Sequence, residues 1–252
     1  MKAMILAAGL GTRLRPLTDD RPKALVEING RTLLEITLFR LRSFGVTDVI
    51  VNVHHFADKV VDYLKTNDNF GMRIEVSHED ALLDTGGGLK KAAWFLKDSG
   101  SRFVDAAPFI LHNVDVLTTI DIRAMLQFHA ENQALATLAV QARNTSRYLL
   151  FDEKLHLFGR RTGDGEPEPI QPASQTRALA FSGVHIISPR LLSRMDEEGA
   201  FSIITTYLRL AALGEKILAF PADQYYWRDL GRPEDLAQAA NDLKENTISP
   251  GI

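Results

Sequence analysis

The stretch that decides the fold is MILAAGLGTRLRPLTDDRPKAL, residues 4–25. It begins with a short apolar run, passes through a turn that contains Gly9 and Gly11, and continues with three arginines and one lysine. Glycine lets a backbone approach an anion closely and point its N–H groups at it. Together with the fixed positive charge that follows, this pattern indicates that the turn binds phosphate.

Two common phosphate-binding patterns do not fit this stretch. The dinucleotide fingerprint G-x-G-x-x-G needs a third glycine where Leu14 stands, and the P-loop string G-x-x-x-x-G-K-[ST] does not occur. What remains is a strand followed by G-x-G-x-R-x-x-P and a lysine. Arg13 can reach over the phosphates, and Pro16 and Pro22 restrict the loop so that Lys23 can fold back to the same anion.

Composition limits the class of protein. The 252 residues are 45% hydrophobic with a formal net charge of −3, which is enough apolar material for one substantial core. The absence of cysteine excludes disulfides, thiolate metal sites and cysteine nucleophiles. We expect no nucleic-acid partner, because no basic stripe is long enough, and no membrane partner, because no apolar run reaches about 18 residues. Without a signal-peptide pattern, a cytoplasmic protein is expected.

Strand and helix patterns alternate along the first part of the chain. Expected strands are 2–8, 46–54, 72–79 and 107–115, and expected helices are 31–45, 57–66, 88–100 and 120–133. Short continuous apolar strands of this kind are typical of a parallel sheet that is covered on both faces. We therefore predict a single α/β domain, Rossmann-like, with a mixed, mostly parallel central sheet and helices on both faces.

The second part of the chain is more mixed. Further strands are expected at 135–143, 148–153, 155–160, 178–188, 216–222 and 225–231, and further helices at 201–214 and 233–246. Residues 159–176 contain three glycines and three prolines, and this composition predicts a mobile surface loop rather than a substrate lid. Histidines 54, 55, 112 and 185 show no metal-ligand spacing, so we interpret them as core or supporting residues.

The segment LAAGLGTRLRPLTDDRPKALVEING, residues 6–30, resembles the signature of the sugar-1-phosphate nucleotidyltransferases, also called nucleoside-diphosphate-sugar pyrophosphorylases. The resemblance implies a Mg²⁺-dependent enzyme that joins a nucleoside triphosphate to a sugar 1-phosphate and releases pyrophosphate. Arg13 and Lys23 would be catalytic, Arg13 holding the leaving pyrophosphate and Lys23 lying near the attacking oxygen. The nucleotide-binding residues implied here are Ala7, Ala8, Gly9, Gly11, Thr12, Arg13 and Lys23.

Later segments extend the resemblance over nearly the whole chain. DALLDTGGGLKKA, residues 80–92, matches a second glycine segment ahead of a helix, where Gly86, Gly87 and Gly88 would contact the nucleotide base. FILHNVDV, residues 109–116, matches a strand that ends in a metal-binding aspartate, here Asp115, at the carboxyl edge of the sheet. Val114 replaces the glycine of the family pattern. Because a β-branched residue resists positive φ, either the backbone is extended there or the sugar-side pocket is reshaped.

The C-terminal part supplies the remaining matches. The string W-x-D-x-G within residues 227–231 gives a second metal ligand, Asp229, and two carboxylates with phosphate oxygens and waters make a plausible Mg²⁺ site. The resemblance also implies sugar contacts from Asn113, Ser182 and Gly183. A Glu-Lys-Pro string that holds the sugar phosphate in many relatives is missing, and Arg160 or Arg161 could substitute for its lysine.

The resemblance divides the domain 1–252 into a nucleotide-binding half, 1–120, and a sugar-phosphate-binding half, 121–252, with a small sugar-binding subregion. The chain is most similar to N-acetylmuramate 1-phosphate uridylyltransferases, which implies UTP and that sugar. Mannose- or heptose-1-phosphate guanylyltransferases are the alternative, and a choline-phosphate cytidylyltransferase is a weaker one. A catalytically silent nucleotide-binding regulator is a further alternative, and Leu14 disfavours a nicotinamide-dependent oxidoreductase. The sequence leaves the oligomeric state open.

Overall fold

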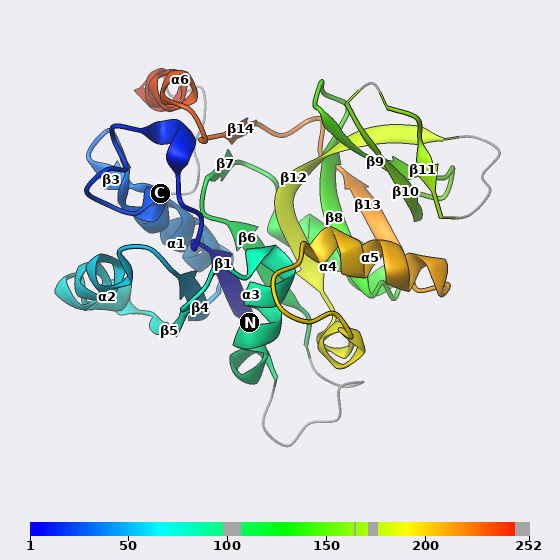
Figure 1. Cartoon of the computed structure of the whole chain (residues 1–252), viewed down its shortest axis with the longest axis horizontal. Coiled ribbons are helices and arrows are strands. Elements are labelled where there is room, and N and C mark those ends of the chain that lie inside the picture. The colour runs from blue at the N-terminus through cyan, green and yellow to red at the C-terminus, as the bar shows by residue number, and fades with distance from the viewer. Residues whose placement is uncertain (98–106, 164, 171–175, 245–252) are drawn as a thin grey trace.

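A ten-stranded sheet forms the centre of the protein (Figure 1). Its first half is parallel: β1 (Lys2–Leu6) pairs with β4 (Asp48–Val53) on one side and with β6 (Phe109–Asn113) on the other, and β4 pairs with β5 (Arg73–His78). Because parallel strands run in the same direction, their carboxyl ends lie together at one edge of the sheet. This computed structural model describes residues 1–97, 107–163, 165–170 and 176–244.

The second half of the sheet is built around the long strand β12 (Arg177–Ile187), which runs antiparallel to β6. Strands β8 (Ala136–Gln141) and β9 (Arg147–Phe151) also pair with β12, both antiparallel. Two further groups of strands complete this half of the sheet. Strand β13 (Ile217–Pro221) pairs with β8 in parallel, and β10 (Leu157–Thr162) pairs with β9 and with β11 (Glu168–Pro169), both antiparallel.

The prediction of a surface loop over 159–176 is wrong in part, because β10 and β11 pair within it. A Cβ on Gly159 would lie 2.6 Å from the Glu168 carbonyl oxygen, so the glycine permits this close pairing. Pro169 is tolerated because β11 is an edge strand. The glycine and proline content therefore reflects an edge hairpin; residues 164 and 171–175 lie outside the described residues.

Helices cover both faces of the sheet, as predicted. In β1, Ala3 and Ile5 belong to one core and Met4 to the other, as the two-residue period of a strand requires. The first core takes in helices α1 (Leu33–Ser43), α2 (Ala57–Thr66), α4 (Ile122–Glu131) and α6 (Pro233–Lys244). The second takes in α3 (Asp84–Leu96) and α5 (Ile203–Ala212). The Rossmann-like fold class is confirmed.

Two short antiparallel ladders lie outside the main sheet. One pairs β2 (Glu27–Ile28) with β3 (Arg31–Thr32); the other pairs β7 (Val116–Thr118) with β14 (Trp227–Asp229) and so brings the C-terminal part of the chain to the end of β6. The 3-10 helices are η1 (Thr12–Leu14), η2 (Lys23–Leu25), η3 (Asp68–Gly71) and η4 (Pro189–Arg194). Across the described residues, no helix is both long and apolar enough to cross a bilayer.

Candidate active site

The glycine turn after β1 folds back on itself. Gly11 has φ +66°, in the left-handed region, and a Cβ there would lie 3.0 Å from Thr18 Cγ2 and 3.2 Å from Lys23 Cβ. The Thr18 hydroxyl also donates a hydrogen bond to the Gly11 carbonyl oxygen at 2.9 Å. Glycine is therefore required both for the conformation and for the packing. The turn brings Lys23 beside Gly11, as the sequence predicted.

Lys23 and Asp115 form a nearly buried ion pair. Pro22 precedes η2, and the side chain of Lys23, its first residue, is only 9% exposed while its Nζ contacts Asp115 Oδ2. Asp115 lies in the turn between β6 and β7, and the Val114 N–H donates to the Leu6 carbonyl oxygen at 3.1 Å. Val114 does not have a positive φ, so the β-branched residue fits this turn without strain.

Arg13 and Asp229 form a second, more exposed pair at the same edge of the sheet. Arg13 Nη2 lies 3.8 Å from Asp229 Oδ1, which also accepts a hydrogen bond from the Gly231 N–H at 2.8 Å. The Leu230 N–H donates to the Asp115 carbonyl oxygen at 2.8 Å. This bond places the two aspartates on neighbouring chain segments although they are far apart in the sequence.

Replacing Gly231 with alanine should separate the Arg13–Asp229 pair. The added Cβ would lie 2.4 Å from Arg13 Nη2 and 2.5 Å from Asp229 Oδ1, so the flexible arginine must move. We expect turnover to fall roughly a hundredfold, since a misplacement of about 1 Å in a catalytic array costs that much. The melting temperature should stay near that of the wild type. Steady-state kinetics test this, and wild-type turnover would contradict a role for the pair.

A cavity of about 230 Å³ opens between these two pairs, and we call it the first cavity. Its lining comprises Leu6, Ala7, Gly9, Gly11, Thr12, Arg13, Lys23, Val114, Asp115 and Gly231. All of the nucleotide-binding residues predicted from the opening stretch are in this set except Ala8, which is buried beside it. Gly231 was not predicted as a site residue, although the W-x-D-x-G string contained it.

A buried polar chain supports the first cavity from behind, and the sequence analysis missed it. Asn52 Oδ1 accepts a hydrogen bond from the Ala7 N–H at 2.7 Å, and Asn52 Nδ2 donates to Glu79 Oε1 at 2.7 Å. Glu79 is fully buried, and its other oxygen accepts from the Leu83 N–H at 2.9 Å. These hydrogen bonds from Asn52 and Glu79 fix the start of the glycine turn. Their only sequence signal was an asparagine within the otherwise apolar run of residues 49–53.

The three glycines at 86–88 do not lie ahead of a helix, so that prediction is wrong in position. Helix α3 begins at Asp84 and contains them. The N–H groups of Gly86 and Gly87 both point to the Phe201 carbonyl oxygen, at 2.8 and 3.3 Å. The helix extends through these poor helix formers because their missing side chains let residues 199–201 pack against it. A contact between these glycines and a nucleotide base stays a prediction.

Replacing Gly87 with alanine should destabilise the fold. The added Cβ would lie 2.5 Å from the Gly199 carbonyl oxygen and 2.9 Å from Leu83 Cβ, and a backbone atom cannot yield cheaply. We expect the free energy of unfolding to fall by about 1–3 kcal/mol in urea titrations. Gly9→Ala is the matched control, because its Cβ would meet nothing within 4 Å. If Gly87→Ala and Gly9→Ala have the same free energy of unfolding, the packing role of Gly87 is wrong.

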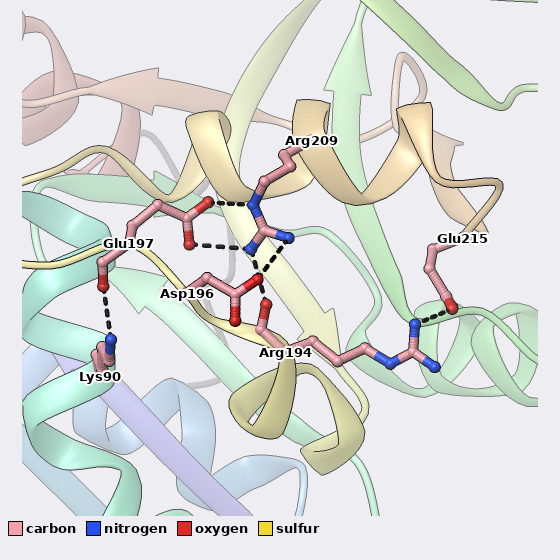
Figure 2. Close-up of polar contacts among 6 residues, drawn as sticks. All are labelled: Lys90, Arg194, Asp196, Glu197, Arg209 and Glu215. Carbon is pink, nitrogen blue, oxygen red and sulfur yellow. Dashed lines mark hydrogen bonds and ion pairs between the residues drawn. The ribbon is translucent and has the colours of Figure 1, made fainter.

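The segment that packs on these glycines is anchored by a charged network (Figure 2). Arg209 on α5 donates to both oxygens of Glu197, at 2.8 and 3.1 Å, and to the Arg194 carbonyl oxygen at 2.7 Å. Lys90 on α3 donates to the Glu197 carbonyl oxygen at 2.6 Å. The Thr85 hydroxyl oxygen accepts from the Ile203 N–H at 2.9 Å. The last bond ties the start of α3 to the start of α5, and the others hold the segment before α5 against both helices.

A second cavity, of about 630 Å³, lies between the starts of α3 and α5 and the strands β9, β10 and β12. Asn113, Gly183 and Asp229 line it, so two predicted sugar residues and one predicted metal ligand meet there. Gly183 has φ +74°, and its Cβ would lie 3.0 Å from Asn113 Nδ2. Ser182 is fully buried, and its side chain does not line this cavity.

Four arginines line the second cavity: Arg143, Arg147, Arg160 and Arg161. Sequence analysis named only the last two. Arg160 Nε is paired with Glu168 at 2.7 Å on the edge hairpin, and the Arg161 guanidinium lies 4.7 Å from the Tyr148 ring centroid. The excess of positive charge makes the second cavity suited to an anionic ligand.

The two aspartates offer a limited but suitable set of ligands for Mg²⁺. Asp115 Oδ2 contacts Lys23 and Asp229 Oδ1 accepts from Gly231, which leaves one oxygen of each carboxylate without a partner among the described residues. Within the same residues, no group of three acidic, histidine or cysteine side chains could hold a metal. Mg²⁺ takes oxygen ligands and commonly binds through one or two carboxylates plus substrate phosphates, so the donor set fits.

The fold and site define a class of α/β protein with a cavity lined by cations and a carboxylate at the carboxyl edge of its sheet. Residues 2–154 match the family model described as nucleotidyl transferase. Among curated proteins, the chain is 34% identical over 248 residues to an N-acetylmuramate alpha-1-phosphate uridylyltransferase of Caulobacter vibrioides, covering 96% of this chain and 97% of that one. It is 30% identical to a mannose-1-phosphate guanyltransferase of Yarrowia lipolytica, covering 93% of this chain and 62% of that longer protein.

Solved structures confirm the fold. HddC from Yersinia pseudotuberculosis, in a crystal structure with GMP-PN, has a TM-score of 0.76 at 23% identity, covering 96% of this chain and 99% of that one. A putative glucose-1-phosphate thymidylyltransferase from Bacillus anthracis has a TM-score of 0.77 at 18% identity, covering 99% and 96%. The protein belongs to the nucleotidyl transferase family, and the resemblance expected from its opening stretch is confirmed.

Proposed function

We propose that the protein transfers a nucleoside monophosphate from a nucleoside triphosphate to a sugar 1-phosphate, with release of pyrophosphate. The observation that carries this proposal is the arrangement of Asp115 and Asp229. They lie on hydrogen-bonded segments at the carboxyl edge of the sheet, each beside a cation, where one cavity holds Asp115 and the other holds Asp229. Two phosphate-bearing substrates can meet there.

The reaction needs no side-chain nucleophile. A sugar 1-phosphate is mostly dianionic near neutral pH, because the second pKa of a phosphate monoester is about 6. Its oxygen attacks the α-phosphorus of the triphosphate, and pyrophosphate leaves. The barrier comes from repulsion between anions and from positioning, so catalysis is mainly orientation and electrostatic stabilisation. A site made of cations and carboxylates, without a serine or cysteine nucleophile, suits this chemistry.

Each charged group then has a role, with Arg13, Lys23 and Asp115 at the first cavity and Asp229 at the second. Arg13, which is exposed, would hold the phosphates of the leaving pyrophosphate. Lys23, which is nearly buried, would lie at the α-phosphate and the attacking oxygen. Asp115 and Asp229 would hold Mg²⁺, which neutralises phosphate charge when it is bound. The Asn52–Glu79 chain would keep the glycine turn in place while the substrates exchange.

The two halves of the domain would divide the substrates between them. Residues 1–120 supply the glycine turn, Lys23 and Asp115, and would bind the nucleotide. Residues 121–252 supply most of the second cavity and would bind the sugar phosphate. The division is not complete, because Gly231 lines the first cavity and Asn113 lines the second.

The favoured substrates are UTP and N-acetylmuramate 1-phosphate. The Caulobacter relative bears that name and matches this chain over almost the full length of both proteins. The four arginines of the second cavity also suit a sugar that carries a carboxylate in addition to its phosphate. GTP with mannose 1-phosphate is the second candidate, supported by 30% identity to the Yarrowia enzyme.

A pyrophosphate-release assay tests the proposal. The purified protein is incubated with Mg²⁺ and each of UTP, GTP, CTP, ATP and dTTP against a panel of sugar 1-phosphates. We expect release with UTP and N-acetylmuramate 1-phosphate; release only with GTP and mannose 1-phosphate would replace that pair by the second candidate. Triphosphate binding without release from any pair would contradict the transferase function and favour a silent binding role.

A further inference from the structure

We propose that Arg143 binds the phosphate of the sugar 1-phosphate in the second cavity. This inference rests on the proposed function and assigns one of its two substrates to a specific residue. A cation is needed there, because Arg13 and Lys23 both line the first cavity and neither lines the second.

Arg143 is held rigidly at the wall of the second cavity. It follows β8, and its Nη2 donates to the Phe181 carbonyl oxygen at 2.7 Å. Its guanidinium carbon lies 3.5 Å from the ring centroid of Trp227, a stacked position. Trp227 is itself fixed, because its Nε1 donates to the Ser182 carbonyl oxygen at 2.7 Å. The guanidinium is therefore oriented by two partners before any ligand binds.

Most of the donors of Arg143 have no partner among the described residues. A guanidinium has five N–H donors, and the Phe181 carbonyl takes only one site. Its Nε is buried without a partner, and in the described part of the chain Arg143 has no carboxylate within ion-pair distance. A planar fork with free donors matches two oxygens of a phosphate.

The position of Arg143 relative to Asp229 indicates which part of the ligand it meets. Trp227 and Asp229 lie on β14, two residues apart, and both line the second cavity with Arg143. The phosphate of the sugar must reach the Mg²⁺ that we propose at Asp229. Arg143 lines the same cavity as Asp229, so it lies within the space where that phosphate binds.

The arginines named from the sequence are less suited to this role. Arg160 is exposed and already paired with Glu168 on the edge hairpin. Arg161 lies over Tyr148, where β10 pairs with β9, and its Nε is also buried without a partner, but it does not stack on Trp227 as Arg143 does. Arg161 is therefore better placed for another part of the sugar, and it serves as the competing assignment in the experiment.

The experiment compares Arg143→Met with Arg161→Met and with the control Arg123→Met. Arg123 is an exposed residue on α4 whose guanidinium also lies over an aromatic ring, 5.7 Å from Phe44, but outside both cavities. For each protein, KM and kcat are measured for both substrates of the wild-type pair found in the pyrophosphate assay. Calorimetry gives the dissociation constant of N-acetylmuramate 1-phosphate, or of mannose 1-phosphate if that is the substrate.

We expect Arg143→Met to weaken binding of the sugar 1-phosphate roughly 10- to 100-fold, the value of a charge-assisted hydrogen bond. Affinity for the triphosphate and the melting temperature should stay near wild type, and Arg143→Lys should recover part of the loss. The inference is overturned if Arg143→Met leaves the affinity for the sugar 1-phosphate unchanged, or lowers the affinities for both substrates equally. It is also overturned if Arg161→Met lowers the affinity for the sugar 1-phosphate more than Arg143→Met does. Failure of the proposed function is distinct, because the wild type itself would then release no pyrophosphate.

Discussion

Replacing Asp115 with asparagine should lower turnover by roughly two to three powers of ten, as removal of a transition-state contact does elsewhere. Asparagine keeps the size of the side chain and can still accept a hydrogen bond from Lys23, but it lacks the charge that a metal ligand needs. The backbone bond from Leu230 to the Asp115 carbonyl oxygen is retained in the variant. The protein should therefore stay folded and still bind a triphosphate, although the loss of the nearly buried ion pair with Lys23 lowers its melting temperature.

Pyrophosphate release and circular dichroism measure the two parts of this prediction separately. Asp62→Asn, an exposed substitution on α2, is the matched control and should keep wild-type turnover. The assignment of Asp115 would be wrong if the variant were active, or if its loss of activity were accompanied by unfolding.

Acidification should destabilise the protein through three buried histidines. Burial lowers the pKa of His112 and of His129 from 6.5 to about 4, and that of His185 to about 3. These groups stay neutral in the folded protein, whereas the unfolded chain binds protons below pH 6.5. Their contribution is therefore fully present above that pH and is lost as the pH falls toward the folded pKa values.

The expected loss is about 1.4 kcal/mol for each histidine one pH unit below its unfolded pKa, or roughly 4 kcal/mol together. Urea unfolding at about pH 7.5 and about pH 5.5 measures it. His129→Gln should remove about one third of the difference, while replacing the exposed His78 in the same way should leave it unchanged. A free energy of unfolding that is equal at the two pH values would contradict this account.

Much of the fold could be predicted because it depends on local patterns. Alternating apolar strands and amphipathic helices fixed the parallel half of the sheet, and the carboxyl-edge rule placed Asp115 beside the glycine turn. Two of the four histidines, His112 and His185, are buried as expected. His54 is half-buried and His55 is exposed, so for His55 the core interpretation is wrong.

What could not be predicted depends on contacts between distant segments. The Asn52–Glu79 hydrogen bond joins β4 to the residue that follows β5, through side chains whose pairing no local pattern reveals. The helical position of Gly87 follows from its packing against Gly199, more than a hundred residues later. Arg143 was missed for the same reason: its place beside Trp227 exists only after β8 and β14 come together.

Isotope labelling tests the central claim most directly, because it follows the attacking oxygen. The sugar 1-phosphate identified by the pyrophosphate assay is prepared with ¹⁸O in its phosphate group and incubated with the triphosphate, Mg²⁺ and the protein. If the sugar phosphate attacks the α-phosphorus, mass spectrometry will find all of the label in the nucleotide sugar and none in pyrophosphate. Label in pyrophosphate, or a nucleotide sugar that has lost phosphate label, would contradict the mechanism that the two aspartates and their paired cations support.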